Sequence, residues 1–273
     1  MATIPINGTD IYYREAGPRD APALLFVHGM CGFADVWEDQ INRLSADFRC
    51  VAYDRRGHTR SPLGEVERRT VELHADDAAA LIQALDLAPC VLVGSSGGAR
   101  IGLDVVRRYP QLLAGAVLSE PPALALAPEG AAAFVGALRP ILEAAVAKGG
   151  PRAAVDAFFD HVCSGLWRRI DDGKRDRYRD NAAELFGDLQ MPPYQVTVDD
   201  LAAISVPCRI VSGDLSHPVF REIARVLANH IPGAELVELA GSGHVTYAEK
   251  PEEFAAAVRD FARRVAPTVA RAA

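Results

Sequence analysis

A serine set among glycines, in the segment Gly94-Ser95-Ser96-Gly97-Gly98, has the surroundings that nucleophilic chemistry requires. An apolar run, residues 90–93, comes before it and predicts a strand, and residues 97–109 follow with a helical pattern. The spacing G-x-S-x-G between a strand and a helix is typical of a tight turn that exposes a serine hydroxyl. We therefore predict Ser96 as a nucleophile and Ser95 as a structural residue. The alternative is a glycine-rich turn without chemistry.

A serine hydroxyl becomes an effective nucleophile when a nearby base accepts its proton, and histidine suits that role near neutral pH. The chain has seven histidines, and His244 lies between the last predicted strand, 235–239, and the last predicted helix, 251–265. Loops that follow parallel strands meet at one edge of a sheet. We therefore expect His244 to lie beside Ser96 and to act as its base.

Short apolar runs alternate with helical stretches along most of the chain. Asn7-Gly8 between apolar segments predicts an initial β-hairpin. The further predicted strands are 23–27, 49–53, 90–93, 115–119, 208–211 and 235–239, and the clearest helices are 70–85, 97–109, 220–229 and 251–265. This alternation predicts an α/β fold with a parallel sheet that helices cover on both faces.

The alternation is interrupted between residues 119 and 208, where helical stretches at 130–148, 151–163 and 174–189 have no strand between them. We expect residues 121–206 to form a helical cap over the carboxyl edge of a core made of residues 1–120 and 207–273. Six aromatic residues of this segment are expected mostly to pack the cap, and some to line an apolar substrate pocket. They are Phe134, Phe158, Phe159, Trp167, Phe186 and Tyr194.

Composition excludes several other classes of protein. The chain has 273 residues, 49% of them hydrophobic, and a net charge of −7 without a basic patch, which argues against disorder and against nucleic-acid binding. No apolar run is long enough to predict a membrane span, and no leader is expected. Five cysteines without a CxxC pair favour a cytoplasmic setting, and no metal-ligand spacing appears. The sequence leaves open whether the protein forms a homo-oligomer.

Four motifs together resemble the α/β-hydrolase superfamily along nearly the whole chain. They are Phe26-Val27-His28-Gly29, Asp54-Arg55-Arg56-Gly57-His58, Gly94-x-Ser96-x-Gly98 and Gly243-His244. The resemblance implies a mostly parallel eight-stranded sheet and a helical cap inserted after the sixth strand. It also implies an oxyanion hole from two backbone N–H groups, those of Gly97 and Met30. Such donors stabilise the negative charge of a tetrahedral intermediate.

The carboxylate that should orient His244 has two candidates. The resemblance places it after the seventh strand, where the loop reads Gly213-Asp214-Leu215-Ser216 and Ser216 occupies the expected position of the acid. Asp214 lies two positions early. Some members of the superfamily, zearalenone-type lactonases among them, take the acid from the end of the sixth strand instead, which here is Glu120. A carboxylate that ends an apolar strand is unfavourable to bury without a partner, and this favours Glu120.

These residues predict a cofactor-independent serine hydrolase that acts on a small apolar carboxylic ester or lactone. Hydrolysis of a C–C bond in a diketone-like substrate is the alternative within the same fold. A non-catalytic ligand-binding protein is a third possibility, because a fold does not determine a function. A dinucleotide-binding oxidoreductase fits less well, because glycines 94, 97, 98 and 102 do not have the G-x-G-x-x-G spacing.

Overall fold

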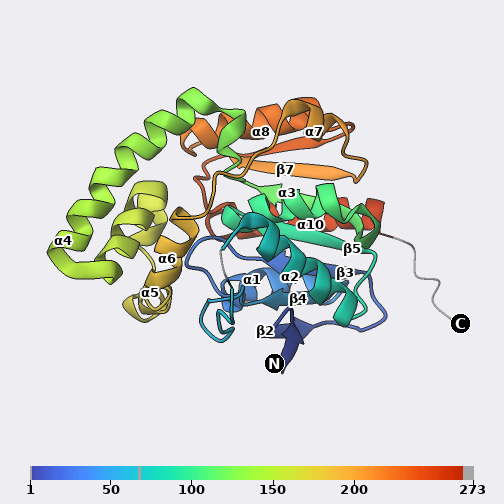
Figure 1. Cartoon of the computed structure of the whole chain (residues 1–273). Coiled ribbons are helices and arrows are strands. Elements are labelled where there is room, and N and C mark those ends of the chain that lie inside the picture. Colours follow the sequence, from blue (N-terminus) through green and yellow to red (C-terminus); the bar gives the residue numbers. More distant parts are fainter. Residues whose placement is uncertain (1, 67–68, 267–273) are drawn as a thin grey trace, which may run out of the picture.

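An eight-stranded sheet forms the centre of the molecule in the computed structural model, which describes residues 2–66 and 69–266 (Figure 1). Its strand order is β1-β2-β4-β3-β5-β6-β7-β8. The strands are β1 (Ala2–Ile6), β2 (Thr9–Ala16), β3 (Ala23–Val27), β4 (Arg49–Tyr53), β5 (Cys90–Ser95), β6 (Leu113–Ser119), β7 (Cys208–Gly213) and β8 (Glu235–Leu239). The pairs β1–β2 and β2–β4 are antiparallel, and all other neighbours are parallel. This confirms the predicted α/β fold and its mostly parallel sheet.

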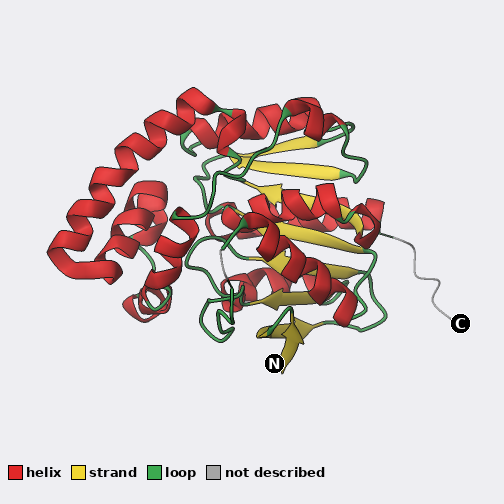
Figure 2. Ribbon diagram, viewed as in Figure 1, coloured by secondary structure: helices red, strands yellow, loops and turns green. Residues whose placement is uncertain are grey.

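Helices cover the sheet on both faces, and Figure 2 shows the strands as a layer between them. The covering helices are α1 (Glu38–Leu44), α2 (Val71–Ala84), α3 (Gly97–Arg108), α8 (Pro218–His230) and α10 (Pro251–Val265). Helix α2 packs on α3 in front of the strands in Figure 1, and α1 packs on α10 behind them. The short helices η1 (Ala34–Trp37), η2 (Pro110–Leu112) and α9 (Thr246–Glu249) lie in the connections.

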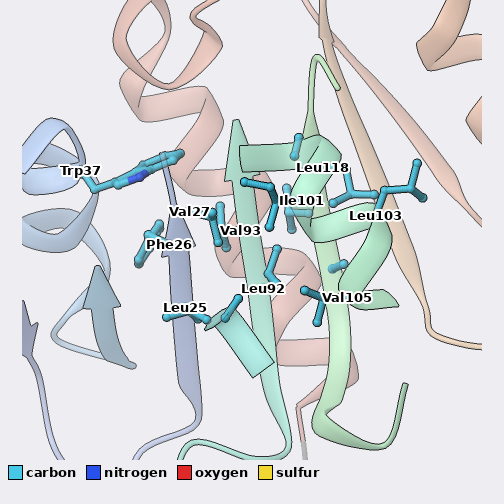
Figure 3. Close-up of a cluster of buried hydrophobic side chains, with 14 of the residues drawn as sticks. Leu25, Phe26, Val27, Trp37, Leu92, Val93, Ile101, Leu103, Val105 and Leu118 are labelled. Carbon is cyan, nitrogen blue, oxygen red and sulfur yellow. The ribbon is translucent and has the colours of Figure 1, made fainter. Parts of the chain in front are cut away.

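The central strands β3 and β5 are buried along their whole length, as continuous apolar runs in a parallel sheet should be. Figure 3 shows Phe26 of β3, Val93 of β5 and Ile101 of α3 in one apolar cluster. Trp37 packs against this cluster, with the centre of its ring 5.2 Å from the centre of the Phe26 ring. Close packing of this kind fixes the ends of β3 and β5, and with them the loops that follow.

The segment between β6 and β7 is helical, with η3 (Leu124–Leu126), α4 (Pro128–Trp167), α5 (Asp172–Arg179), α6 (Ala182–Leu189) and α7 (Val198–Ala202). The insertion after the sixth strand is therefore present, and Figure 1 shows α4 arching away from the sheet around α5 and α6. The two helices predicted at 130–148 and 151–163 run together as α4, with a kink at Gly150, where φ is 74°. Pro151 follows and cannot donate a helical hydrogen bond, which favours the kink.

The single helix predicted at 174–189 is wrong, because Asp180 and Asn181 separate α5 from α6. The Asn181 side chain donates hydrogen bonds to the carbonyl oxygens of Cys31 and Gly32, each 3.0 Å away. These long-range bonds hold Asn181 out of a regular helix.

The division into a core and a cap domain stays a prediction, although helices occupy the predicted insertion. An 18-residue window within residues 128–163 has a mean hydropathy of 1.4, which by length and composition alone would suit a membrane span. Ordinary core helices reach this value too, so the predicted lack of a membrane span is neither supported nor opposed by it. All five cysteines are buried and free.

Candidate active site

Ser96 lies in a tight turn between β5 and α3. Its φ is 52° and its ψ is −122°, a combination that non-glycine residues rarely adopt. The turn needs glycine on both sides, because a Cβ on Gly94 would lie 2.5 Å from the carbonyl oxygen of Gly98, and one on Gly98 would overlap the carbonyl of Val27. The structure therefore has the strained turn that the glycine spacing predicts, with Ser96 at the carboxyl edge of the sheet. Ser95 is buried beneath it.

His244 lies after β8 with its Nε2 atom 2.9 Å from the Ser96 Oγ atom. The Glu249 carboxylate holds the loop that carries His244. Glu249 accepts hydrogen bonds from the N–H groups of Gly243, at 2.8 Å, and Val245, at 3.2 Å. The backbone is thus fixed on both sides of His244, which limits the freedom of its ring.

The carboxylate of Glu120 reaches His244 from the end of β6, with Oε2 3.2 Å from Nδ1. Glu120 is fully buried, and its φ of 54° turns it out of the strand direction. Its Oε1 atom accepts from the Ser212 hydroxyl and the Gly213 N–H, both at 2.8 Å, and its Oε2 atom accepts from the Ser216 hydroxyl at 2.5 Å. Three donors besides His244 therefore compensate the burial of this charge.

The other predicted acid, Asp214, forms its hydrogen bond with the backbone and not with His244. It is partly exposed, and its Oδ1 atom accepts a hydrogen bond from the N–H of Gly241 at 2.7 Å. Ser216, which occupies the expected position of the acid, contacts Glu120 instead. The sequence reasoning missed the supporting roles of Ser212 and Ser216. Their signal was present as two hydroxyl residues, Ser212 at the end of the seventh strand and Ser216 in the turn after it.

The two predicted oxyanion donors, Met30 and Gly97, face each other across the site. A Cβ on Gly97 would lie 3.5 Å from the backbone nitrogen of Met30. Neither N–H donates a hydrogen bond within residues 2–66 and 69–266, so both are free to bind an oxygen atom. The loop after Met30 is held by Asn181, which bonds to the carbonyl oxygens of Cys31 and Gly32. Cys31 itself is buried packing, and burial raises the pKa of its thiol well above the ordinary value.

A cavity of about 1070 Å³ lies between the catalytic edge and the inserted helices, with Ser96 and His244 in its wall. Its lining is mainly apolar. Of the six aromatic residues predicted for a pocket or for cap packing, those that line this cavity are Phe134, Phe158, Phe186 and Tyr194. Phe159 and Trp167 instead stack on each other, with ring centres 4.5 Å apart. Within the described residues, no cluster of His, Cys, Asp and Glu is arranged to hold a metal ion.

A buried ion pair lies next to the cavity, and one of its members, Asp188, lines the cavity wall. Arg55 and Asp188 form an ion pair of 2.8 Å and are almost completely inaccessible to solvent. The nearby side chains of His28 and His58 are also buried, and burial, reinforced by the positive charge of Arg55, holds their pKa values well below the ordinary value. His28 accepts a hydrogen bond from the Arg55 N–H at 2.9 Å. These two histidines therefore fix loops rather than contact Ser96.

Comparison with known proteins agrees with this architecture. The model of the alpha/beta hydrolase family matches residues 24–257. A thermophilic esterase from Thermogutta terrifontis has a similar structure, with a TM-score of 0.78 and 24% identity over 98% of this chain and 100% of that one.

Two relatives known by sequence match part of the chain. The uncharacterized hydrolase YraK of Bacillus subtilis (strain 168) is 39% identical over 120 residues, 44% of each chain. The bifunctional esterase/perhydrolase DCH of Acinetobacter calcoaceticus is 42% identical over 106 residues, 38% of each chain. The match therefore spans less than half the length of these relatives.

Proposed function

The chain belongs to the alpha/beta hydrolase family, and on this premise we propose that it is a serine hydrolase of carboxylic esters and lactones. The observation that carries the proposal is the continuous series of contacts from Ser96 through His244 to Glu120. It lies in the wall of a cavity large enough for a small-molecule substrate. The Acinetobacter relative is a bifunctional esterase/perhydrolase, and this similarity supports the same class of reaction.

In the proposed reaction Glu120 accepts a hydrogen bond from the Nδ1–H group of His244, which leaves Nε2 unprotonated toward Ser96. Nε2 takes the hydroxyl proton as the Ser96 oxygen attacks the ester carbonyl carbon. The carbonyl oxygen becomes negatively charged and is bound by the N–H groups of Met30 and Gly97. Loss of one such donor typically removes about 3 kcal/mol of transition-state stabilisation.

The tetrahedral intermediate collapses when the protonated His244 gives its proton to the leaving alkoxide. An acyl group then remains on Ser96, and His244 activates a water molecule that releases it as a carboxylic acid. A lactone follows the same steps, except that its leaving hydroxyl stays tethered to the acyl group. Both substrates place one carbonyl between the same nucleophile and the same two donors.

The experiment that tests the proposal is labelling with a fluorophosphonate, followed by assays on a panel of esters, lactones and β-diketones. We expect wild type to label and to hydrolyse esters, Ser96→Ala to do neither, and the matched control Ser95→Ala to label. Turnover of diketones but not of esters would favour C–C bond hydrolysis instead. Neither labelling nor turnover in folded protein would contradict the proposal and favour a ligand-binding protein.

A further inference from the structure

One guanidinium in the cavity wall, that of Arg100, has no counterion among residues 2–66 and 69–266. Arg100 lies on α3, and its N–H donates to the Ser96 carbonyl oxygen at 3.0 Å, which places it one helical turn beyond the nucleophile. Its side chain lines the same cavity as Ser96 and His244. Within the described part of the chain, its Nε atom is buried without a hydrogen-bond partner, and its guanidinium forms no hydrogen bond with another side chain.

The other arginines of α3 differ in this respect. Arg107 pairs with Asp200 at 2.7 Å, and Arg108 pairs with Asp104 at 2.6 Å. Both of these arginines are therefore neutralised by a carboxylate of the chain itself, whereas Arg100, on the same helix, is not.

The carboxylates near Arg100 do not neutralise it. Asp188 also lines the cavity, but it is already committed to Arg55, with which it forms a buried ion pair of 2.8 Å. Glu72 interacts with Arg100 only at long range and is exposed to solvent. Burial lowers the pKa of Arg100, opposed by the charge of Asp188, yet a guanidinium stays protonated near neutral pH. The remaining carboxylate of the lining, Glu143, is exposed to solvent and forms no ion pair with Arg100. Within the described residues, the charge of Arg100 is thus unpaired at a largely apolar cavity.

Arg100 is partly buried, and a cation in such a position without a partner is unfavourable, so a bound anion would relieve that cost. We propose that Arg100 binds a carboxylate of the substrate, so that the preferred substrate is an ester or lactone that carries a carboxylate group beside an apolar part. A guanidinium matches a carboxylate through two parallel hydrogen bonds, and one unpaired charge suits one monoanion. The inference rests on the proposed hydrolase function and narrows its substrate class.

The geometry also limits where the carboxylate lies. Four residues of helix separate the Cα atoms of Ser96 and Arg100 by ~6 Å along the helix axis. The anionic group is therefore a few bonds from the scissile carbonyl, on either the acyl side or the alcohol side of the ester. Half-esters of short dicarboxylic acids, and acyl esters of hydroxy acids, have this length.

Matched substrate pairs test the proposal in kinetics. On the acyl side we compare p-nitrophenyl hemiglutarate with p-nitrophenyl hexanoate, and on the alcohol side 4-acetoxybenzoate with p-tolyl acetate. We expect Arg100→Met to lower kcat/KM for the anionic member of one pair by roughly 10- to 100-fold, the usual effect of losing a charged hydrogen bond. The neutral member should change less than about threefold, and Arg100→Lys should retain part of the preference.

Arg263, an exposed arginine of α10 that lies outside the cavity lining and pairs with Asp47, supplies the matched control. Arg263→Met should leave both members of each pair unchanged. Equal effects of Arg100→Met on anionic and neutral esters, in both pairs, would overturn the proposal. Arg100→Gln provides a second variant if the methionine variant does not fold.

A binding measurement separates this inference from the proposed reaction. Ser96→Ala should bind monomethyl glutarate in calorimetry, and the double variant with Arg100→Met should bind it at least tenfold more weakly. If wild type hydrolyses no ester but this difference in binding appears, the reaction is wrong and the anion site stands. If esters are hydrolysed but binding is the same with and without Arg100, the anion site is wrong.

Discussion

Replacing Glu120 with glutamine exchanges one carboxylate oxygen for an NH₂ group, and the structure determines which oxygen is lost. The Oε1 position accepts a hydrogen bond from the N–H of Gly213, a donor that cannot reverse its direction. The amide oxygen must therefore take this position. The NH₂ group then occupies the position of Oε2, 3.2 Å from Nδ1 of His244.

An NH₂ group at this place donates to Nδ1, so the imidazole proton moves to Nε2. Nε2 is the atom that faces the Ser96 hydroxyl at 2.9 Å, and once protonated it cannot accept the serine proton. In the serine protease triad the corresponding change from Asp to Asn lowers kcat by about 10⁴-fold. We expect Glu120→Gln to lower kcat/KM by ~10³- to 10⁴-fold, which is ~4 to 5.5 kcal/mol of transition-state stabilisation.

The assay is kcat/KM for p-nitrophenyl butyrate, with thermal unfolding as a check that each variant is folded. Asp214→Asn is the matched control, because Asp214 bonds to the N–H of Gly241 and not to His244. It should change kcat/KM less than about threefold, since a partly exposed surface bond contributes little. A folded Glu120→Gln protein with more than a tenth of wild-type activity would refute the reasoning, as would a larger loss in Asp214→Asn.

Three further variants probe the buried polar groups. Ser216→Ala removes a donor to the Glu120 carboxylate and should lower the free energy of unfolding by ~1.5–3 kcal/mol in urea titrations. Asp77→Ala leaves the buried Arg56 without its two hydrogen bonds of 2.7 Å and should lower the same quantity by ~3–5 kcal/mol. Burial lowers the pKa of His74 to about 3, so the unfolded chain takes up a proton at this site first as the pH falls below about 6.5. Stability is therefore lost below that pH, and His74→Gln should reduce the difference in unfolding free energy between pH 7.5 and 5.5 by ~1.4 kcal/mol.

Controls for these variants come from neighbouring positions. Ser216→Thr keeps the hydroxyl and should retain most of the stability. Asp76, next to Asp77, is 41% exposed and pairs with Arg108, so Asp76→Ala should change the free energy of unfolding by no more than ~1 kcal/mol. Equal losses at positions 76 and 77 would contradict the role given to burial. An unchanged pH dependence in His74→Gln would contradict the pKa argument.

Much of the sheet is predictable because buried parallel strands are unbroken apolar runs between turn residues. The bounds of β3 and β4, 23–27 and 49–53, agree with the sequence prediction for this reason. Strand β5 runs two residues further than predicted, through Gly94 and Ser95, because the backbone of these residues continues to pair with β6. A propensity for strand cannot reveal that pairing, since glycine and serine disfavour strands by themselves.

The site is less predictable where it depends on distant partners. The break at Asn181 follows from bonds to carbonyl groups about 150 residues earlier in the chain, which no local pattern contains. The sequence likewise left both Glu120 and Asp214 as acids. Two features of the fold distinguish these candidates. The positive φ of Glu120 turns its side chain out of the strand direction, and the pairing of β6 with β7 brings the Ser212 hydroxyl within hydrogen-bond distance of its carboxylate.

The bonds from Asn181 to the loop beside Met30 connect the cap helices to the proposed oxyanion hole. Helix α6 lines the cavity through Phe186 and Leu189, and its junction with α5 also holds the loop that carries Met30, the proposed oxyanion donor. A change in α6 that widens the cavity and displaces Asn181 should therefore alter the substrate range and lower the rate together. A substitution in α4, for example at Leu142, which also lines the cavity, changes the shape of the cavity without altering these two bonds. Libraries aimed at bulkier substrates should begin on that helix.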